Sequence, residues 1–165
     1  YDIRKNIGFN AEMAELDRTD RRILELIQRD GRITNAELAQ RTGIPPTSMS
    51  DRLKRLQKQG YILGFTARID PHRIGLELLV FVEVSLDKTT PDAFDKFSRA
   101  VRNAPEILEC HMVAGGFDYL VKARVTDMAH YRSFLGDVLL TMPGVSETRT
   151  YPVMEEVKSD APLPI

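Results

Sequence analysis

The chain has 165 residues, enough for one ordinary domain or two small ones, and its 42% hydrophobic and 28% charged residues are typical of a soluble globular protein. We expect no membrane span and no signal peptide, because there is no apolar run of about 18 residues and no apolar core near the N-terminus. The single cysteine, Cys110, excludes an intramolecular disulfide and suits a reducing cytoplasm.

The net charge of −1 conceals an asymmetry along the chain. Residues 1–70 hold 13 Lys and Arg against 10 Asp and Glu, whereas the remainder holds 10 against 14. A modestly basic front and an acidic back indicate two domains with different tasks. Residues 1–15 show no sustained periodicity, and we predict a flexible N-terminal tail there.

Three short helices are predicted between Leu16 and Gly60. Asp17 or Thr19 can cap the first, whose apolar positions are Ile23, Leu24 and Ile27. The second opens with the capping-box pair Thr34 and Glu37 and ends at Gly43, a residue suited to a tight turn. Pro45 and Pro46 delay the third helix until Thr47.

The third helix has two chemically different sides. Met49, Leu53 and Leu56 recur on one side, and Arg52, Lys54, Arg55 and Lys58 lie within seven residues of one another. This spacing after a small-residue turn indicates a helix-turn-helix, whose second helix places its first residues on base edges and its cations on phosphates. The predicted DNA-binding residues are Thr47, Ser48, Ser50, Arg52, Lys54, Arg55 and Lys58. A three-helix core with a merely solvated charged side is the alternative.

A connecting segment follows the helices. We assign 16–62 to a helix-turn-helix domain and predict a linker strand over 63–75, because Tyr61 to Ile69 is β-prone and could form a small wing. Asp70-Pro71 is a natural boundary, since proline disfavours helix at the residue before it.

The second half of the chain alternates apolar and polar residues. Every second residue from Leu76 to Leu86 is apolar, which predicts a strand with one buried face. Thr90-Pro91 then opens a helix with Phe94, Phe97 and Val101 inward. Two further strands flank a Gly-Gly turn, and Asp127 caps a second helix that carries Met128, Tyr131, Leu135, Val138 and Leu139. A fourth strand runs from Val145 to about Met154.

This order, strand-helix-strand-strand-helix-strand, is the ferredoxin-like βαββαβ arrangement. The predicted fold class is therefore α+β, with an N-terminal winged helix-turn-helix and a ferredoxin-like domain over 76–158, followed by a C-terminal tail over 159–165. Two helices cover one face of such a sheet, and the other face stays bare with Leu79 and Phe81 among its apolar residues. A bare apolar face predicts dimerisation.

The sequence offers little for an enzyme. His72, His111 and His130 are isolated, and no metal site or cofactor is predicted. Cys110 and His111 are neighbours in a strand, so their side chains point to opposite faces and cannot form a nucleophile–base pair. Gly115-Gly116 does not open a helix as a dinucleotide-binding motif would.

The segment AGGFDY, residues 114–119, has two interpretations. It could be a simple hairpin turn, or its glycine amides could hold a carboxylate while Asp118 attracts an ammonium group. The second interpretation predicts a pocket for a zwitterionic amino acid.

Several linked motifs resemble one family. LDRTDRRILELIQRDGRITNAELAQRTG, RLKRLQKQGYI, ECHMVAGGFDYLVKARVTDM and PGVSETRTYPVMEEVK together look like the Lrp/AsnC (feast/famine) family of transcription regulators, over Leu16 to Lys158. Two departures are visible. Gly116 stands where the family often has an acid, and the recognition helix begins PPTSMSDR where SPTPCLER is common.

The resemblance implies a bacterial regulator that forms dimers, often four of them in an octamer, that binds double-stranded DNA and that holds an amino acid between dimers. It places the effector-binding residues at Gly115, Gly116, Phe117, Asp118 and Tyr119, with Met128 and Tyr151 nearby.

We therefore predict a cytoplasmic, nucleoid-associated regulator whose DNA binding or assembly responds to leucine or another small amino acid. Two alternatives stay open at this point. One is an architectural protein that wraps DNA without an effector. The other is a small amino-acid-processing enzyme that uses the GGFD loop, although no nucleophile, base or metal set accompanies that loop.

Overall fold

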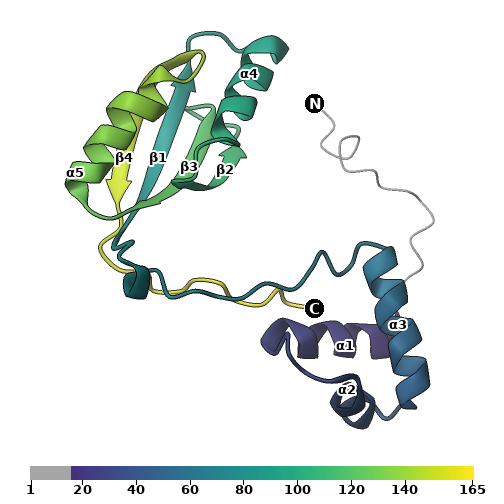
Figure 1. Ribbon diagram of the computed structural model, residues 1–165. Coiled ribbons are helices and arrows are strands. Elements are labelled where there is room, and N and C mark those ends of the chain that lie inside the picture. The colour runs from purple at the N-terminus through teal and green to yellow at the C-terminus, as the bar shows by residue number, and fades with distance from the viewer. Residues whose placement is uncertain (1–15) are drawn as a thin grey trace. The chain divides into compact units, whose positions relative to one another are not determined.

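A computed structural model describes residues 16–165, and the tail predicted over 1–15 lies outside the described residues. The chain forms two compact units (Figure 1). The first comprises the described residues through Arg68 together with Lys158–Ile165, and the second is Ile69–Val157. Within the described part of the chain, no helix is both long and apolar enough to cross a membrane.

Three helices build the first unit: α1 (Arg18–Arg29), α2 (Asn35–Thr42) and α3 (Pro46–Lys58). The Asp17 side chain caps α1 by accepting from the Asp20 amide at 2.7 Å. The capping box at α2 is confirmed, because Thr34 accepts from the Glu37 amide at 3.2 Å and Glu37 accepts from the Thr34 amide at 2.9 Å. These caps fix where the helices begin.

The turn between α2 and α3 follows from its residue types. Gly43 adopts a left-handed conformation, with φ of 72°, which costs glycine no steric penalty. The third helix begins at Pro46, one residue before the predicted start, because proline needs no hydrogen-bond partner at the first helical position. The helices enclose a core of Ile23, Leu24, Leu26, Ile27, Leu38, Ala39, Met49, Leu56 and Ile62.

The linker does not form the strand expected within residues 63–75. Residues 63–69 are exposed, and Leu63 keeps 97% of its surface accessible before a 3₁₀ turn at His72–Ile74. A strand needs a hydrogen-bonded neighbour, and none of the described segments pairs with the linker in the single chain. The β-prone composition of the linker is therefore not realised as a strand here.

The last eight residues of the chain belong to the first unit. The Gln28 side chain on α1 accepts from the Leu163 amide at 2.7 Å and donates to the Leu163 carbonyl at 3.4 Å. Asp160 pairs with Arg68 at 3.1 Å. The segment predicted as a separate tail over 159–165 is thus attached to the helical unit.

The second unit contains four strands and two helices in the predicted order. The elements are β1 (Leu78–Leu86), α4 (Pro91–Val101), β2 (Ile107–Met112), β3 (Tyr119–Val125), α5 (Met128–Ser133) and β4 (Val145–Pro152). The strands form one antiparallel sheet in the order β2-β3-β1-β4, and both helices cover the same face (Figure 1). The ferredoxin-like prediction is confirmed.

The central strand β1 divides its side chains between the two faces of the sheet. Val80, Val82 and Val84 are fully buried beneath the helices. Phe81 and Glu83 point to the other face and are half-buried. Leu79, expected on the bare face, is only 5% exposed. The segment after β4 runs beside it, and the Val153 amide donates to the Leu79 carbonyl at 2.9 Å.

The second helix is less regular than predicted. After Ser133 it continues as a π-helical turn, Phe134–Val138, and a 3₁₀ turn, Leu139–Thr141. Met128, predicted as part of this helix, occupies the first helical position after the Asp127 cap and is 54% exposed. Tyr131 and Leu139 are buried as predicted.

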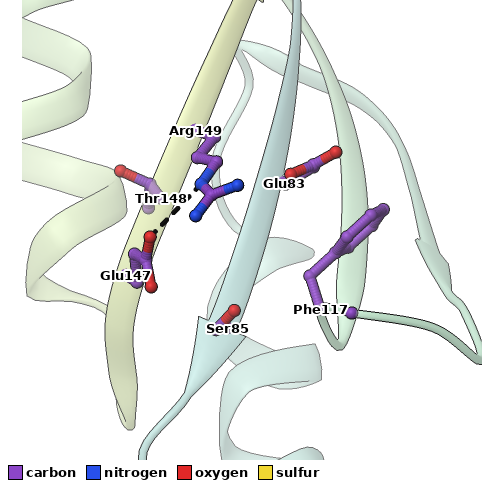
Figure 2. A pocket seen from close by; sticks show the side chains of 7 residues that line it. Glu83, Ser85, Phe117, Glu147, Thr148 and Arg149 are labelled. Carbon is purple, nitrogen blue, oxygen red and sulfur yellow. Dashed lines mark hydrogen bonds and ion pairs between the residues drawn. The ribbon is translucent and has the colours of Figure 1, made fainter.

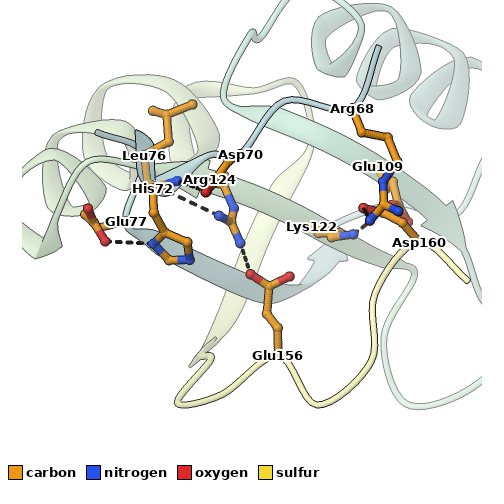
Figure 3. Close-up of polar contacts among 10 residues, drawn as sticks. All are labelled: Arg68, Asp70, His72, Leu76, Glu77, Glu109, Lys122, Arg124, Glu156 and Asp160. Carbon is orange, nitrogen blue, oxygen red and sulfur yellow. Dashed lines mark hydrogen bonds and ion pairs between the residues drawn. The ribbon is translucent and has the colours of Figure 1, made fainter. Parts of the chain in front are cut away.

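One buried ion pair joins the sheet to the C-terminal segment. Arg124 on β3 is buried, and its guanidinium donates to Glu156 and to the Leu76 carbonyl (Figure 3). On the same face, Lys122 pairs with Glu109 of β2 at 2.9 Å (Figure 3). Because a buried guanidinium is costly without acceptors, the Glu156 contact holds the segment after β4 against the sheet.

Candidate nucleic-acid interface and ligand cavity

Helix α3 presents a continuous exposed side. Thr47, Asp51, Lys54 and Lys58 are exposed and follow one another at helical spacing, opposite the buried Met49. Ser48 is exposed as well, and Ser50 is half-buried. Neither Lys54 nor Lys58 forms an ion pair within the described residues, so both ammonium groups are available to a ligand.

Arg52 and Arg55 are placed differently. Both donate to the carboxylate of Asp20 on α1, Arg52 at 2.8 Å and Arg55 at 2.5 Å, and Arg52 also donates to Asp17 at 2.6 Å. The Asp20 side chain is only 3% exposed. Hydrogen bonding to Arg52 lowers the pKa of Asp17, and hydrogen bonds to Asp17 and Asp20 raise the pKa of Arg52.

This network fixes α3 on α1. A buried carboxylate must be paired, and here its partners are two arginines one turn apart on the neighbouring helix. Arg52 and Arg55 of α3 therefore contact α1, whereas Lys54 and Lys58 form no ion pair among the described residues. Sequence reasoning missed Asp20, although the spacing of Asp17 and Asp20 matches that of Arg52 and Arg55.

In the second unit, the turn between β2 and β3 is held at the end of β1. The Val113 amide donates to the Asp118 carbonyl at 3.0 Å, and the Asp118 amide donates to the Val84 carbonyl at 3.0 Å. The Asp118 carboxylate accepts from the Leu86 amide at 2.8 Å, where the pairing of β1 with β4 shifts register. Asp118 thus anchors the turn whatever else it binds.

A cavity of about 300 Å³ lies beside this turn (Figure 2). It is lined by Glu83 and Ser85 of β1, Gly116 and Phe117 of the turn, and Glu147, Thr148 and Arg149 of β4. Arg149 pairs with Glu147 at 3.3 Å, and the dashed line in Figure 2 marks this contact. The cavity therefore offers both a cation and two carboxylates, which is the charge pattern that a zwitterion requires.

The structure brings only some of the predicted effector residues to this cavity. Gly116 and Phe117 line it, and the exposed Gly115 is next to them. Tyr151 is connected indirectly, because a hydrogen bond to Glu83 raises the pKa of its phenol. Glu83, Ser85, Glu147 and Arg149 were missed, since strand pairing rather than sequence proximity brings them together.

Tyr119 and Met128 lie elsewhere in the single chain. Tyr119 is packed in the core, with its ring centroid 4.6 Å from that of Phe97. Met128 lies beyond the other end of β3, a strand of seven residues, which separates it from the turn by roughly 20 Å at the usual rise. Their contact with an effector stays a prediction.

The unit shows no arrangement suited to covalent catalysis. Burial raises the pKa of the Cys110 thiol to about 11, so the thiol stays protonated and is a poor nucleophile. His72 pairs with Glu77 at 2.8 Å and His111 lies 3.2 Å from Glu109, both on the surface. Among residues 16–165, no group of three His, Cys, Asp or Glu side chains could hold a metal ion.

Comparison with known proteins connects the two units to two family models. A model described as winged helix-turn-helix DNA-binding matches residues 16–62, and one described as Lrp/AsnC ligand binding domain matches residues 79–163. The leucine-responsive regulatory proteins of Escherichia coli (strain K12) and Salmonella typhimurium are each 53% identical over 151 residues, or 92% of this chain and 92% of theirs.

Solved structures agree in fold over nearly the whole chain. A transcriptional regulator from Neisseria meningitidis, in complex with L-Met, is 37% identical with a TM-score of 0.86 and covers 91% of this chain and 97% of its own. An AsnC family transcriptional regulator from Agrobacterium tumefaciens is 28% identical with a TM-score of 0.85, covering 90% and 96%.

A helix-turn-helix unit joined to a ligand-binding sheet unit defines a DNA-binding transcription regulator, not an enzyme. The chain belongs to the Lrp/AsnC family. Membership of this family confirms the prediction of an amino-acid-responsive regulator, and the family models confirm the winged helix-turn-helix class.

We expect Asp20→Asn to lower the free energy of unfolding of the helical unit by roughly 2 kcal/mol, because both arginines would lose a charged acceptor in a buried position. Urea unfolding followed by circular dichroism measures this loss. Asp51→Asn is the matched control, since Asp51 is exposed on α3 and should change stability by less than about 0.5 kcal/mol. Equal stability of the two variants would show that the pairing contributes little.

Proposed function

We propose that an oligomer of this chain binds a roughly palindromic DNA site through paired α3 helices and that a small amino acid, leucine or methionine foremost, alters this binding. The observation that carries the proposal is the cavity beside the β2–β3 turn, which places Arg149 between two carboxylates. The leucine-responsive relatives and the neighbour bound to L-Met support an aliphatic effector.

On the DNA side, the exposed residues of α3 are the proposed contacts. Thr47, Ser48 and Ser50 at the start of the helix would reach base edges, and Lys54 and Lys58 would neutralise phosphates. Arg52 and Arg55 would act mainly by orienting α3 through Asp20, and any phosphate contact would have to share their guanidinium groups with that carboxylate.

On the effector side, a zwitterion would place its carboxylate near Arg149 and the amides of the turn, and its ammonium group near Glu83 or Glu147. These acids compensate for Gly116, which stands where the family often has an acidic residue. Asp118 would hold the turn in place and add negative charge beside the cavity.

Assembly would use the bare face of the sheet. Neither helix of the second unit covers it (Figure 1), and Phe81 and Leu120 are half-buried there beside Lys122 and Tyr151. We infer a dimer through this face and a larger assembly, such as four dimers. Because Met128 is far from the turn in one chain, it could contact the same effector only from another copy.

A cytoplasmic location associated with the nucleoid follows from this proposed role. The effector-independent architectural alternative has less support, because the second unit matches a ligand-binding family model and contains a charged cavity.

The first test concerns the phosphate contacts. Lys58→Gln should weaken operator binding and lower the slope of log affinity against log salt by about one, as the loss of one phosphate contact predicts. Fluorescence anisotropy at four salt concentrations measures the slope. Lys96→Gln is the control, because Lys96 is paired with Asp92 on α4. An unchanged slope in Lys58→Gln would remove this residue from the interface.

The second test separates the two roles of Asp118. Asp118→Asn keeps an acceptor for the Leu86 amide but removes the charge, so we expect near-normal stability with the leucine-dependent change in DNA affinity reduced by about tenfold. Asp118→Ala should lose both the normal stability and the leucine-dependent change in DNA affinity. A full leucine response in Asp118→Asn, measured by anisotropy with and without leucine, would leave Asp118 with a purely structural role.

The third test addresses the sheet face. Phe81→Arg would place a second cation opposite Lys122 on the proposed interface, and the variant should sediment as a monomer. Leu140→Arg is the control, because Leu140 is an exposed leucine in the helical layer. An oligomer that is retained in Phe81→Arg would contradict the proposed interface.

A further inference from the structure

A second cavity of about 300 Å³ lies in the sheet unit, between α4 and β2. Its lining includes Ser98 and Val101 of α4, Arg102 directly after that helix, Ile107 and Cys110 of β2, and Tyr119 of β3. It shares no lining residue with the cavity beside the β2–β3 turn. Apart from Tyr119, none of its lining residues is among the residues predicted to bind the effector.

Tyr119 gives this cavity a polar group without a partner. The residue is 3% exposed, and its hydroxyl oxygen forms no hydrogen bond with any residue that the structure describes. Burial raises the pKa of the phenol, and the nearby Ser98 side chain offsets part of that shift. The phenol is therefore a buried hydrogen-bond donor that lacks an acceptor among the described residues.

The Tyr119 ring cannot turn away to find one. Phe97 packs against it with a centroid distance of 4.6 Å, and Phe94 meets it edge-on at 6.1 Å. Because these rings are held in the core, the hydroxyl stays where it is, and an acceptor has to come to it.

Three other polar groups around the cavity can donate a hydrogen bond. Arg102 is exposed and has no ion pair among residues 16–165, Ser98 carries a hydroxyl, and the Cys110 thiol is protonated. The single lining carboxylate, Glu109, is already paired with Lys122 at 2.9 Å and lies 3.2 Å from His111. The cavity therefore favours an anionic ligand, because its lining carboxylate is already paired and is not free to bind an ammonium group.

Apolar side chains complete the lining. Val101 of α4, together with Ile107 and Leu108 of β2, provides aliphatic surface beside these donors. We propose that this cavity binds a short aliphatic carboxylate, whose oxygens accept from Tyr119, Ser98 and Arg102 while its chain packs on the aliphatic residues. The site is independent of the amino-acid cavity.

The test uses 4-methylpentanoate, which is leucine without its ammonium group. Calorimetry on the full chain should show 4-methylpentanoate binding that saturating leucine does not displace. Tyr119→Phe, which removes only the hydroxyl, and Arg102→Gln, at an exposed position, should each weaken binding by about tenfold. Arg99→Gln, an exposed arginine of α4 outside the lining, should bind normally.

Three results would overturn the proposal. The first is no heat at about 10 mM 4-methylpentanoate, as expected if water alone satisfies the hydroxyl. The second is undiminished binding in Tyr119→Phe. The third is loss of binding in Asp118→Asn, which would place the carboxylate in the effector cavity. Loss of the leucine response in Asp118→Asn with intact 4-methylpentanoate binding would support both sites separately.

Discussion

The register of the central strand β1 determines the layout of the sheet unit. The strand is hydrogen-bonded to β3 on one side and to β4 on the other, and its alternate side chains build the core and line the opposite face. A shift of one residue would exchange the two sets. The Asp118 carboxylate pins the β2–β3 turn to the end of this strand, so the cavity beside the turn exists only in this register.

In the helical unit, the buried carboxylate of Asp20 determines how the elements are placed. It binds two arginines of α3, and this pairing sets how the recognition helix lies on α1. Charge that looks like a DNA-binding patch in the sequence is therefore partly internal. Lys54, Lys58 and the short polar residues Thr47 and Ser48 at the start of α3 are exposed, and the Arg55 side chain stays 43% exposed beside Asp20.

Much of the fold was predictable because it is encoded locally. The capping box at Thr34, the turn at Gly43 and the Thr90 cap appear where the sequence placed them, and the strand order followed from the period-two and helical patterns. The predictions that differed depended on distant partners. The linker lacks a neighbour with which to form a strand, and the last residues of the chain attach to α1 through Gln28.

The sequence by itself determined the three helices of the first unit, the order of strands and helices in the second unit and the family, since periodicity and caps act over a few residues and the family motifs span nearly the whole chain. Only the tertiary structure decided which side chains meet. Glu83 lies opposite Arg149 in the pairing of β1 with β4, and Tyr119 packs in the core. Arg52 and Arg55 form ion pairs with Asp20. The physical reason is that strand register and helix packing are settled by contacts between residues far apart in the chain, which no local pattern records.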